Sequence, residues 1–205
     1  MNTEAETAMK MRAYVAVSRK RSQHQSYEDV KVALVNLSKK SPNRPDCAHI
    51  IRLPLALWGG QDFIIPVDAI SPYDLHRAVS MIASEVCGGE TKTFVAASRS
   101  VDQSQIINDV WTNPKKGLIA INLHSKFAGQ KRPNAGEEWP DERILRKIRD
   151  FRKIAVADIV FGEYDIIAIY DASKYAPRKI VEELVDDHEE IEKTSTFLPY
   201  IDVEG

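Results

Sequence analysis

The chain has few cysteines and no long apolar run. Its 205 residues contain two cysteines, Cys47 and Cys87, and no His/Cys spacing typical of a metal site. The sequence therefore predicts neither a disulfide framework nor a metal site, and it indicates a reducing compartment. No stretch approaches the roughly 20 apolar residues of a membrane span, and the polar N-terminus is unlike a signal peptide. We expect a cytoplasmic protein without membrane contact or cofactor.

The sequence also lacks an excess of charge of either sign. It has 28 Lys and Arg residues against 30 Asp and Glu residues, with a formal net charge of −2 at pH 7. Binding to nucleic acid depends on clustered positive charge that neutralises phosphates, and a balanced chain provides no such field. We therefore expect no direct nucleic-acid partner.

What the sequence does contain is a long internal repeat. Residues 57–97 align without a gap onto residues 160–200. The matched residues include Asp62 with Asp165, Asp68 with Asp171, Thr91 with Thr194, and Phe94 with Phe197. A repeat of this length indicates two copies of one domain rather than an array of small units. We predict a first domain at residues 11–99, a linker at residues 100–114 and a second domain at residues 115–203.

Both copies show the same order of predicted elements. The first begins with the β-branched, alternating run R-A-Y-V-A-V, which predicts a strand. A helix follows, and Ser26 with Asp29 forms a predicted capping pair at its start. Two apolar runs predict a hairpin, a second helix has Pro72 at its first position, and a T-K-T-F-V-A-A strand ends the copy. Pro54 and Pro66 lie within the apolar runs, so we expect them at edge or bulged positions.

A β-α-β-β-α-β order predicts a ferredoxin-like α+β sandwich, with an antiparallel sheet and both helices on one face. The other sheet face has apolar residues in both copies and has to be covered. We therefore predict two tandem ferredoxin-like domains that pair sheet against sheet, as a pseudo-dimer similar to a dimeric α+β barrel.

Two motifs of the second copy carry a family resemblance. The turn G-E-Y-D-I-I-A-I begins at Gly162, and the strand E-K-T-S-T-F-L begins at Glu192. They resemble the effector-binding (RAM) domain of the Lrp/AsnC transcriptional regulators. In the first copy the turn reads G-G-Q-D, with Gln61 in place of the aromatic residue. Family members usually begin with a helix-turn-helix domain, whereas about ten residues precede the first strand here, so we expect no DNA-reading helix.

The resemblance implies a non-enzymatic, stand-alone sensing domain that takes part in transcription regulation by binding a small effector, such as an amino acid. It also implies a homo-oligomer and, as further partners, full-length Lrp/AsnC-type regulators. The expected ligand-binding residues surround the turn and the last strand of each copy. They are Gly162, Tyr164, Asp165, Thr194 and Thr196 in the second copy, and Gly59, Gly60 and Asp62 in the first.

Structural roles are an alternative for these residues. A glycine such as Gly162 permits a positive φ, Asp165 can cap the turn, and threonines suit a strand by propensity alone. Two other classes of protein also stay open. One is an enzyme of the dimeric α+β barrel type, such as a small monooxygenase or isomerase, with a cavity between the sheets. The other is a scaffold that uses the fold only for assembly.

Overall fold

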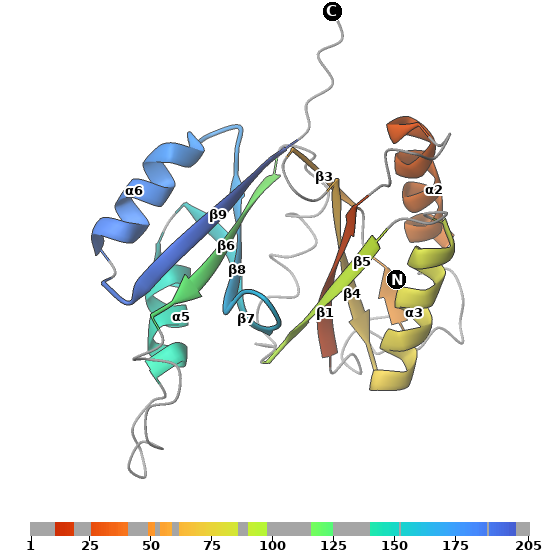
Figure 1. Cartoon of the computed structure of the whole chain (residues 1–205), viewed down its shortest axis with the longest axis horizontal. Coiled ribbons are helices and arrows are strands. Elements are labelled where there is room, and N and C mark those ends of the chain that lie inside the picture. Colours follow the sequence, from red (N-terminus) through yellow and green to blue (C-terminus); the bar gives the residue numbers. More distant parts are fainter. Residues whose placement is uncertain are drawn as a thin grey trace, which may run out of the picture. The chain divides into compact units, whose positions relative to one another are not determined.

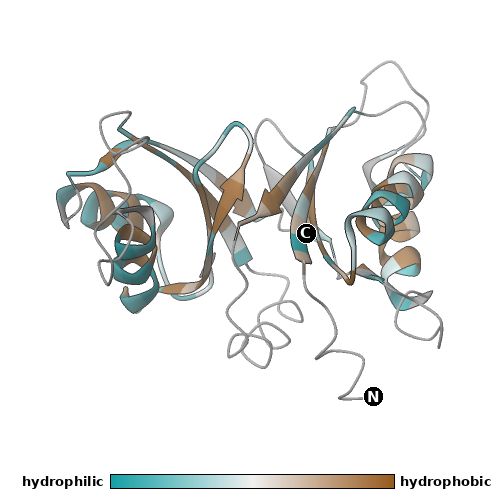
Figure 2. Ribbon diagram, turned by 90° about the horizontal axis from the view of Figure 1, so that it is seen from below, coloured by the Kyte–Doolittle hydropathy of each residue, from teal (hydrophilic) through white to brown (hydrophobic). Residues whose placement is uncertain are grey.

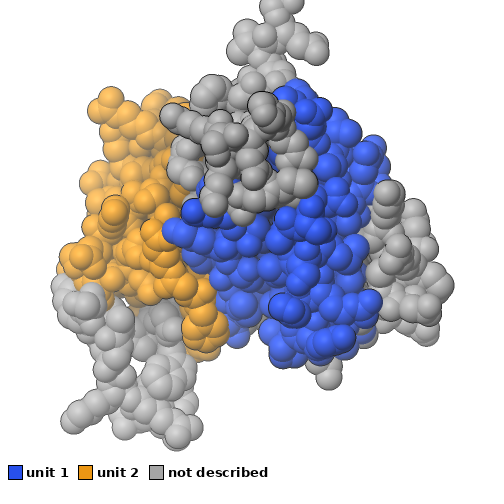
Figure 3. Space-filling model, turned by 45° about the vertical axis from the view of Figure 1, so that its right-hand side comes forward, with its two compact units in different colours: residues 1–99 blue, residues 100–205 orange. Residues whose placement is uncertain are grey.

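The computed structural model describes residues 11–18, 26–40, 49–51, 54–58, 62–85, 90–97, 116–124, 140–151, 153–187 and 189–199. The chain divides into two compact units, Met1–Arg99 and Ser100–Gly205 (Figure 3). The predicted linker at residues 100–114 lies outside the described residues. No helix within the described ranges is long and apolar enough to cross a lipid bilayer.

The first unit is an antiparallel sheet with two helices on one face (Figure 1). Its elements are β1 (Met11–Ser18), α2 (Tyr27–Lys40), β2 (His49–Ile51), β3 (Leu55–Trp58), β4 (Phe63–Ala69), α3 (Pro72–Glu85) and β5 (Glu90–Ala96). Strand β1 lies between β5 and β4, and both β2 and β3 pair with the other side of β4.

The two prolines of the apolar runs explain an interruption in this sheet. Pro54 lies between β2 and β3, and a proline has no N–H to donate to a ladder. Of the two kinds of position expected for Pro66, edge or bulged, the edge is excluded, because β4 has strands on both sides. Pro66 faces Tyr14 of β1. On the other side of β4, β3 pairs with the residues before Pro66, Phe63 and Ile64, and β2 with those after it, 67–69.

The second unit repeats the order β-α-β-β-α-β (Figure 1). Its elements are β6 (Lys116–Leu123), α5 (Pro140–Asp150), β7 (Ile154–Phe161), β8 (Ile166–Asp171), α6 (Pro177–Asp187) and β9 (Ile191–Pro199). The strands are antiparallel in the order β7-β8-β6-β9. The prediction of a mixed α+β fold is therefore confirmed, and each unit has the element order of a ferredoxin-like sandwich.

The capping pair predicted for α2 is formed, and α3 begins with a similar pair that the sequence analysis did not predict. The hydroxyl of Ser26 accepts a hydrogen bond from the backbone N–H of Asp29 at 3.1 Å, and the Ser26 N–H donates to the Asp29 carboxylate at 3.1 Å. Ser71 accepts the N–H of Asp74 in the same way at the start of α3, at 3.3 Å. These reciprocal bonds satisfy N–H groups that a helix start leaves unpaired.

Each unit has its main apolar core between its helices and its sheet. In the first unit, Val15 and Phe63 of the sheet pack with Leu34 of α2 and Ile82 of α3. In the second, strand residues such as Ile121 pack with helix residues such as Ile144. Figure 2 shows the apolar side of the helices toward the sheet and the hydrophilic side away from it. Side chains alternate along a strand, so the residues between these core positions lie on the opposite, helix-free face.

Candidate functional site

The predicted ligand-binding turns are only partly described. Gly59 and Gly60 lie outside the described residues, whereas the turn of the second unit is complete. Gly162 has a φ of 148°, a conformation that L-residues with a side chain rarely adopt. The glycine therefore meets the conformational need of the turn, and its contact with a ligand stays a prediction.

The carboxylate of Asp165 bonds to the chain itself. The backbone N–H of Leu123 donates to Asp165 Oδ2 at 2.8 Å, and the backbone N–H of Asp165 donates to the carbonyl of Ile121 at 3.0 Å. The first unit repeats the second of these bonds, because the N–H of Asp62 donates to the carbonyl of Val17 at 2.9 Å. Asp165 thus joins the turn to the end of β6, as a turn aspartate does.

The remaining predicted residues are half-buried and do not converge on one site. Thr194 and Thr196 face Ile121 and Ile119 across the β6–β9 ladder. Both isoleucines belong to the core between sheet and helices, so the threonines lie on the helix side of the sheet. Thr91 and Thr93 likewise face Val17 and Val15 of the first core. Tyr164 is half-buried in the turn.

A charged pair lies on the helix-free face of the first unit. Arg12 of β1 and Asp68 of β4 face each other across the ladder. Nε and Nη2 of Arg12 each lie 2.8 Å from Asp68 Oδ1, and the side chains are 2% and 0% exposed. Transferring two charges from water carries a desolvation cost that their attraction often fails to offset. Stability alone therefore does not explain why the Arg12–Asp68 pair is buried.

An equivalent pair lies on the helix-free face of the second unit. Lys116 of β6 and Asp171 of β8, the first and third strands of this unit, also face each other across the ladder. Nζ of Lys116 lies 3.1 Å from Asp171 Oδ2, with the side chains 8% and 12% exposed. Asp171 also accepts bonds from the N–H and hydroxyl of Ser173 at 3.1 and 2.5 Å, and Lys174 Nζ lies 3.7 Å from Oδ2.

These contacts keep Asp171 ionised. Burial by itself would raise the pKa of its carboxyl, but the bonds from Ser173 and Lys116 outweigh burial and lower the pKa from 3.8 to about 2. Hydrogen bonds and a nearby cation favour the charged form of a carboxyl. The pair is therefore a fixed arrangement of charges near neutral pH.

A third buried carboxylate has a different position. Asp158 of β7 is 2% exposed, and Nη2 of Arg149 in α5 lies 3.2 Å from its Oδ1. Nε of the same arginine donates to the carbonyl of Ala157 at 2.9 Å. Leu55 stands at the equivalent place in the first copy, so this contact ties α5 to one strand and is not part of the repeated arrangement.

The sequence analysis missed the repeated pairs. The alignment matched Asp68 with Asp171, and a basic residue begins the first strand of each copy. A buried carboxylate and a basic residue at matching ends of two strands were thus both visible. What was missing was the strand register, which places Arg12 opposite Asp68 and Lys116 opposite Asp171.

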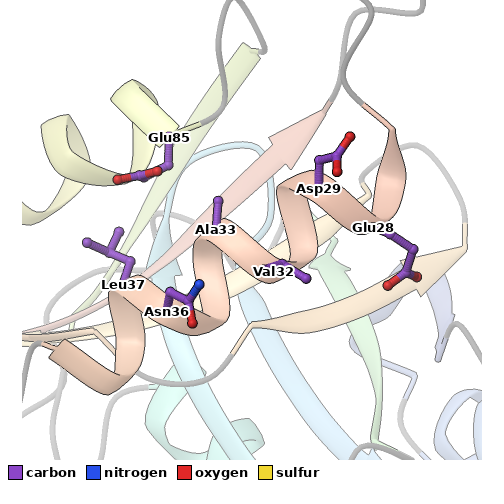
Figure 4. A pocket seen from close by; sticks show the side chains of 7 residues that line it. All are labelled: Glu28, Asp29, Val32, Ala33, Asn36, Leu37 and Glu85. Carbon is purple, nitrogen blue, oxygen red and sulfur yellow. The ribbon is translucent and has the colours of Figure 1, made fainter.

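A surface groove of about 410 Å³ lies along α2 of the first unit. Figure 4 shows side chains from one side of α2 and, from α3, Glu85. Glu28, Asp29 and Glu85 make the groove acidic, and its apolar floor includes the buried Leu37. Glu28 and Asp29 are exposed, and Glu28 pairs with Lys31 at 3.3 Å. This is the pattern of a solvated helix surface, and we assign no ligand to it.

The described residues hold no group of three His, Cys, Asp or Glu side chains placed for a metal ion. Of the described histidines, His49 faces Ala69 of the helix-side core, His76 is exposed on α3, and His124 follows β6. None of these three accompanies the repeated charged pairs.

Comparisons with known proteins give likeness in structure but not in sequence. No family model matches the chain, and no curated protein matches it. Among solved structures, a protein provisionally assigned as a chlorite dismutase aligns with a TM-score of 0.59 at 9% identity, over 95% of this chain and 96% of that one. The chlorite dismutase of Candidatus Nitrospira defluvii aligns at 10% identity, both as a tryptophan-to-phenylalanine variant with cyanide (TM-score 0.53; 98% and 96% covered) and in complex with imidazole (0.54; 92% and 91%).

These likenesses correct the prediction of a non-enzymatic sensing domain for transcription regulation. The three solved structures named above, which share the fold over nearly the whole chain, are chlorite dismutases by name and not regulators of the Lrp/AsnC type.

Proposed function

We propose that this chain is an enzyme of the dimeric α+β barrel type, which converts a small molecule in a cavity between its two sheets. The observation that carries the proposal is the repetition of a buried charged pair on the helix-free face of both units. Groups that are costly to bury are common where chemistry or recognition requires them. The likeness to chlorite dismutases along both chains supports an enzyme over a sensor.

The proposal includes the arrangement of the two sheets as a pseudo-dimer. The helix-free faces carry apolar residues beside their charged pairs: Tyr14 and Ile64 are examples in the first unit, and Leu118, Ile167 and Ile169 in the second. The face of the second unit also holds the buried Asp158, opposite Ile167. An apolar sheet face of this size has to be covered. Sheet-to-sheet pairing would cover both faces and would enclose Arg12 and Lys116 with their partners.

From the neighbouring structures we take only the proposal that this chain is an enzyme, not their cofactor or mechanism. Cyanide and imidazole, which two of the neighbours hold, are ligands of transition metals such as haem iron. Haem iron takes His, Cys, Met or Tyr from the protein, and the charged pairs supply none of these. The described residues of the candidate site thus do not fit a haem or a metal ion, and we derive no step through one.

Small effectors, homo-oligomers and Lrp/AsnC-type regulators were the partners expected from the sequence. A small molecule is kept here as substrate. A homo-oligomer is kept as part of the proposal, because a duplicated sheet protein that exposes Phe161, Leu198 and Tyr73 has apolar surface available for a second copy. Sedimentation at micromolar concentration measures this.

A crystal structure of the full chain is the decisive experiment. We expect the helix-free faces to enclose a cavity with Arg12, Asp68, Lys116 and Asp171 in its wall. Consumption of chlorite, measured by ion chromatography, is the first activity to try, because the neighbours' name states that substrate. Sheets that interdigitate without a cavity would contradict the enzyme proposal and leave the scaffold alternative.

A further inference from the structure

The two charged pairs differ in how far they are exposed to solvent and in the charged groups beside them. In the first unit, Arg12 and Asp68 are 2% and 0% exposed. In the second, Lys116 and Asp171 are 8% and 12% exposed, and Lys174, which is 70% exposed, lies 3.7 Å from the same carboxylate. The second pair is therefore continuous with solvent along Lys174.

The residues that follow each aspartate account for this difference. Asp171 is followed by Ala172, Ser173 and Lys174, whereas Asp68 is followed by Ala69, Ile70 and Ser71. The first copy thus has an isoleucine and a serine where the second has the hydroxyl and the second cation. The additions that surround Asp171 belong to the second copy alone.

The charges of the second site do not cancel. Two ammonium groups, those of Lys116 and Lys174, lie beside the single carboxylate of Asp171. Both oxygens of that carboxylate are engaged, Oδ1 by Ser173 and Oδ2 by the lysines. An ammonium has three N–H donors, and the described residues give Lys116 one partner. The site therefore has one positive charge in excess, with donors available at a largely buried position.

We propose that Lys116 and Lys174, oriented by Asp171, form a binding site for a small monovalent anion, a carboxylate or an oxyanion, and that the Arg12–Asp68 pair of the first unit is a structural counterpart without ligand. The inference rests on the proposed function in one respect, that this anion is the substrate of the enzyme. Charge-assisted bonds to a partly desolvated ammonium are among the stronger polar interactions, and Asp171 would hold Lys116 in place without competing for a second donor.

Acetate and acetamide are the probes, because they have the same shape and differ in charge. Binding to the full-length chain is measured by ligand-observed NMR titration at low salt. We expect acetate to bind and acetamide to bind at least tenfold more weakly, because acetamide cannot accept a hydrogen bond between opposite charges. Equal binding of the two probes, or binding of neither, would overturn the inference.

Variants locate the site. Lys116→Met removes the buried charge and should weaken acetate about tenfold or more, whereas Lys116→Arg should retain binding. Lys174→Gln should weaken it about two- to threefold, and Lys179→Gln, an equal loss of charge on the exposed surface of α6, should leave it unchanged. Lys174 is exposed, so its variant folds even where Lys116→Met does not. Equal effects of Lys174→Gln and Lys179→Gln would mean general charge attraction and no site.

The result is separable from the enzyme proposal. If acetate binds at Lys116 but the crystal structure shows no cavity between the sheets, the anion site is supported and the enzyme proposal is contradicted. If the crystal structure shows a cavity but acetate does not bind, the enzyme proposal is supported and the anion-site proposal is contradicted.

Discussion

Gly117 of β6 and Tyr170 of β8 face each other across the ladder, and the tyrosine ring occupies the space that a side chain at position 117 would need. A Cβ built on Gly117 would lie 2.3 Å from both Cζ and Oη of Tyr170. The same place in the first unit holds Ala13 opposite Val67. The two copies thus fill the same core position in two ways. The second unit uses a tyrosine opposite a glycine, and the first uses a valine opposite an alanine.

Gly117→Ala should destabilise the chain by ~1–3 kcal/mol, the usual cost of overpacking a core. Tyr170→Val should also destabilise, because it leaves a void. The double variant, which copies the Ala/Val solution of the first unit, should be more stable than the sum of the single changes predicts. Urea unfolding of the four proteins measures this coupling. Strict additivity would mean that the two positions do not share space.

Tyr170→Phe tests the buried hydroxyl of the same ring. Tyr170 is fully buried, and its Oη has no hydrogen-bond partner among the described residues. Burying a polar group without a partner is unfavourable, so removal of the hydroxyl should leave stability unchanged or raise it by up to ~1 kcal/mol. If the free energy of unfolding in urea falls by ~2 kcal/mol or more, the hydroxyl makes a stabilising hydrogen bond and the prediction is wrong.

The Tyr170 hydroxyl should also make the stability of the wild type and of Tyr170→Phe differ in its dependence on alkaline pH. Burial raises the pKa of Tyr170 from 10.0 to about 12. The folded state therefore keeps a proton that the unfolded state releases, and the stabilisation present below pH 10 is lost as pH rises from 10 to 12. The wild type should lose ~2–3 kcal/mol more than Tyr170→Phe between pH 9 and 12, since one pKa unit corresponds to 1.36 kcal/mol. Parallel pH profiles of the two proteins would contradict this.

Asp171→Asn should reveal the opposite dependence at acid pH. The folded-state pKa of Asp171 is lowered from 3.8 to about 2, so its stabilisation is present above pH 4 and is lost as pH falls from 4 to 2. The variant should be ~2 kcal/mol less stable than the wild type at pH 7, with the difference shrinking toward pH 2. Asp186→Asn, at an exposed position of α6, is the control and should change little at either pH.

Asp165→Ala should reduce stability and not ligand affinity. The variant loses the acceptor for the N–H of Leu123, and an unsatisfied N–H costs ~1–3 kcal/mol. Asp165→Asn, which keeps an acceptor oxygen, should lose less. A stable Asp165→Ala protein that no longer binds acetate would return the turn to consideration as a binding site.

The sequence by itself determined those features that depend on local pattern. Apolar spacing predicted α2 and α3, the pairs Ser26–Asp29 and Ser71–Asp74 begin these helices, and the repeat predicted the same element order twice. Helix and strand periods and caps act over a few residues, so the α+β class could be read from one chain. A family motif at Gly162 was equally local, and it led to a function that the neighbouring structures contradict.

Only the tertiary structure decided which aspartates are bonded to the fold and which are paired with cations. Asp165 and Asp171 are six residues apart and look alike in sequence. One bonds to the backbone of β6, and the other faces Lys116 at the far end of the same strand. Strand register selects these partners, and a shift by one residue would turn every side chain to the other face. The charge excess at Lys116 and the fit of Tyr170 over Gly117 arise from that register, because contacts between distant strands exist only once the sheet has formed.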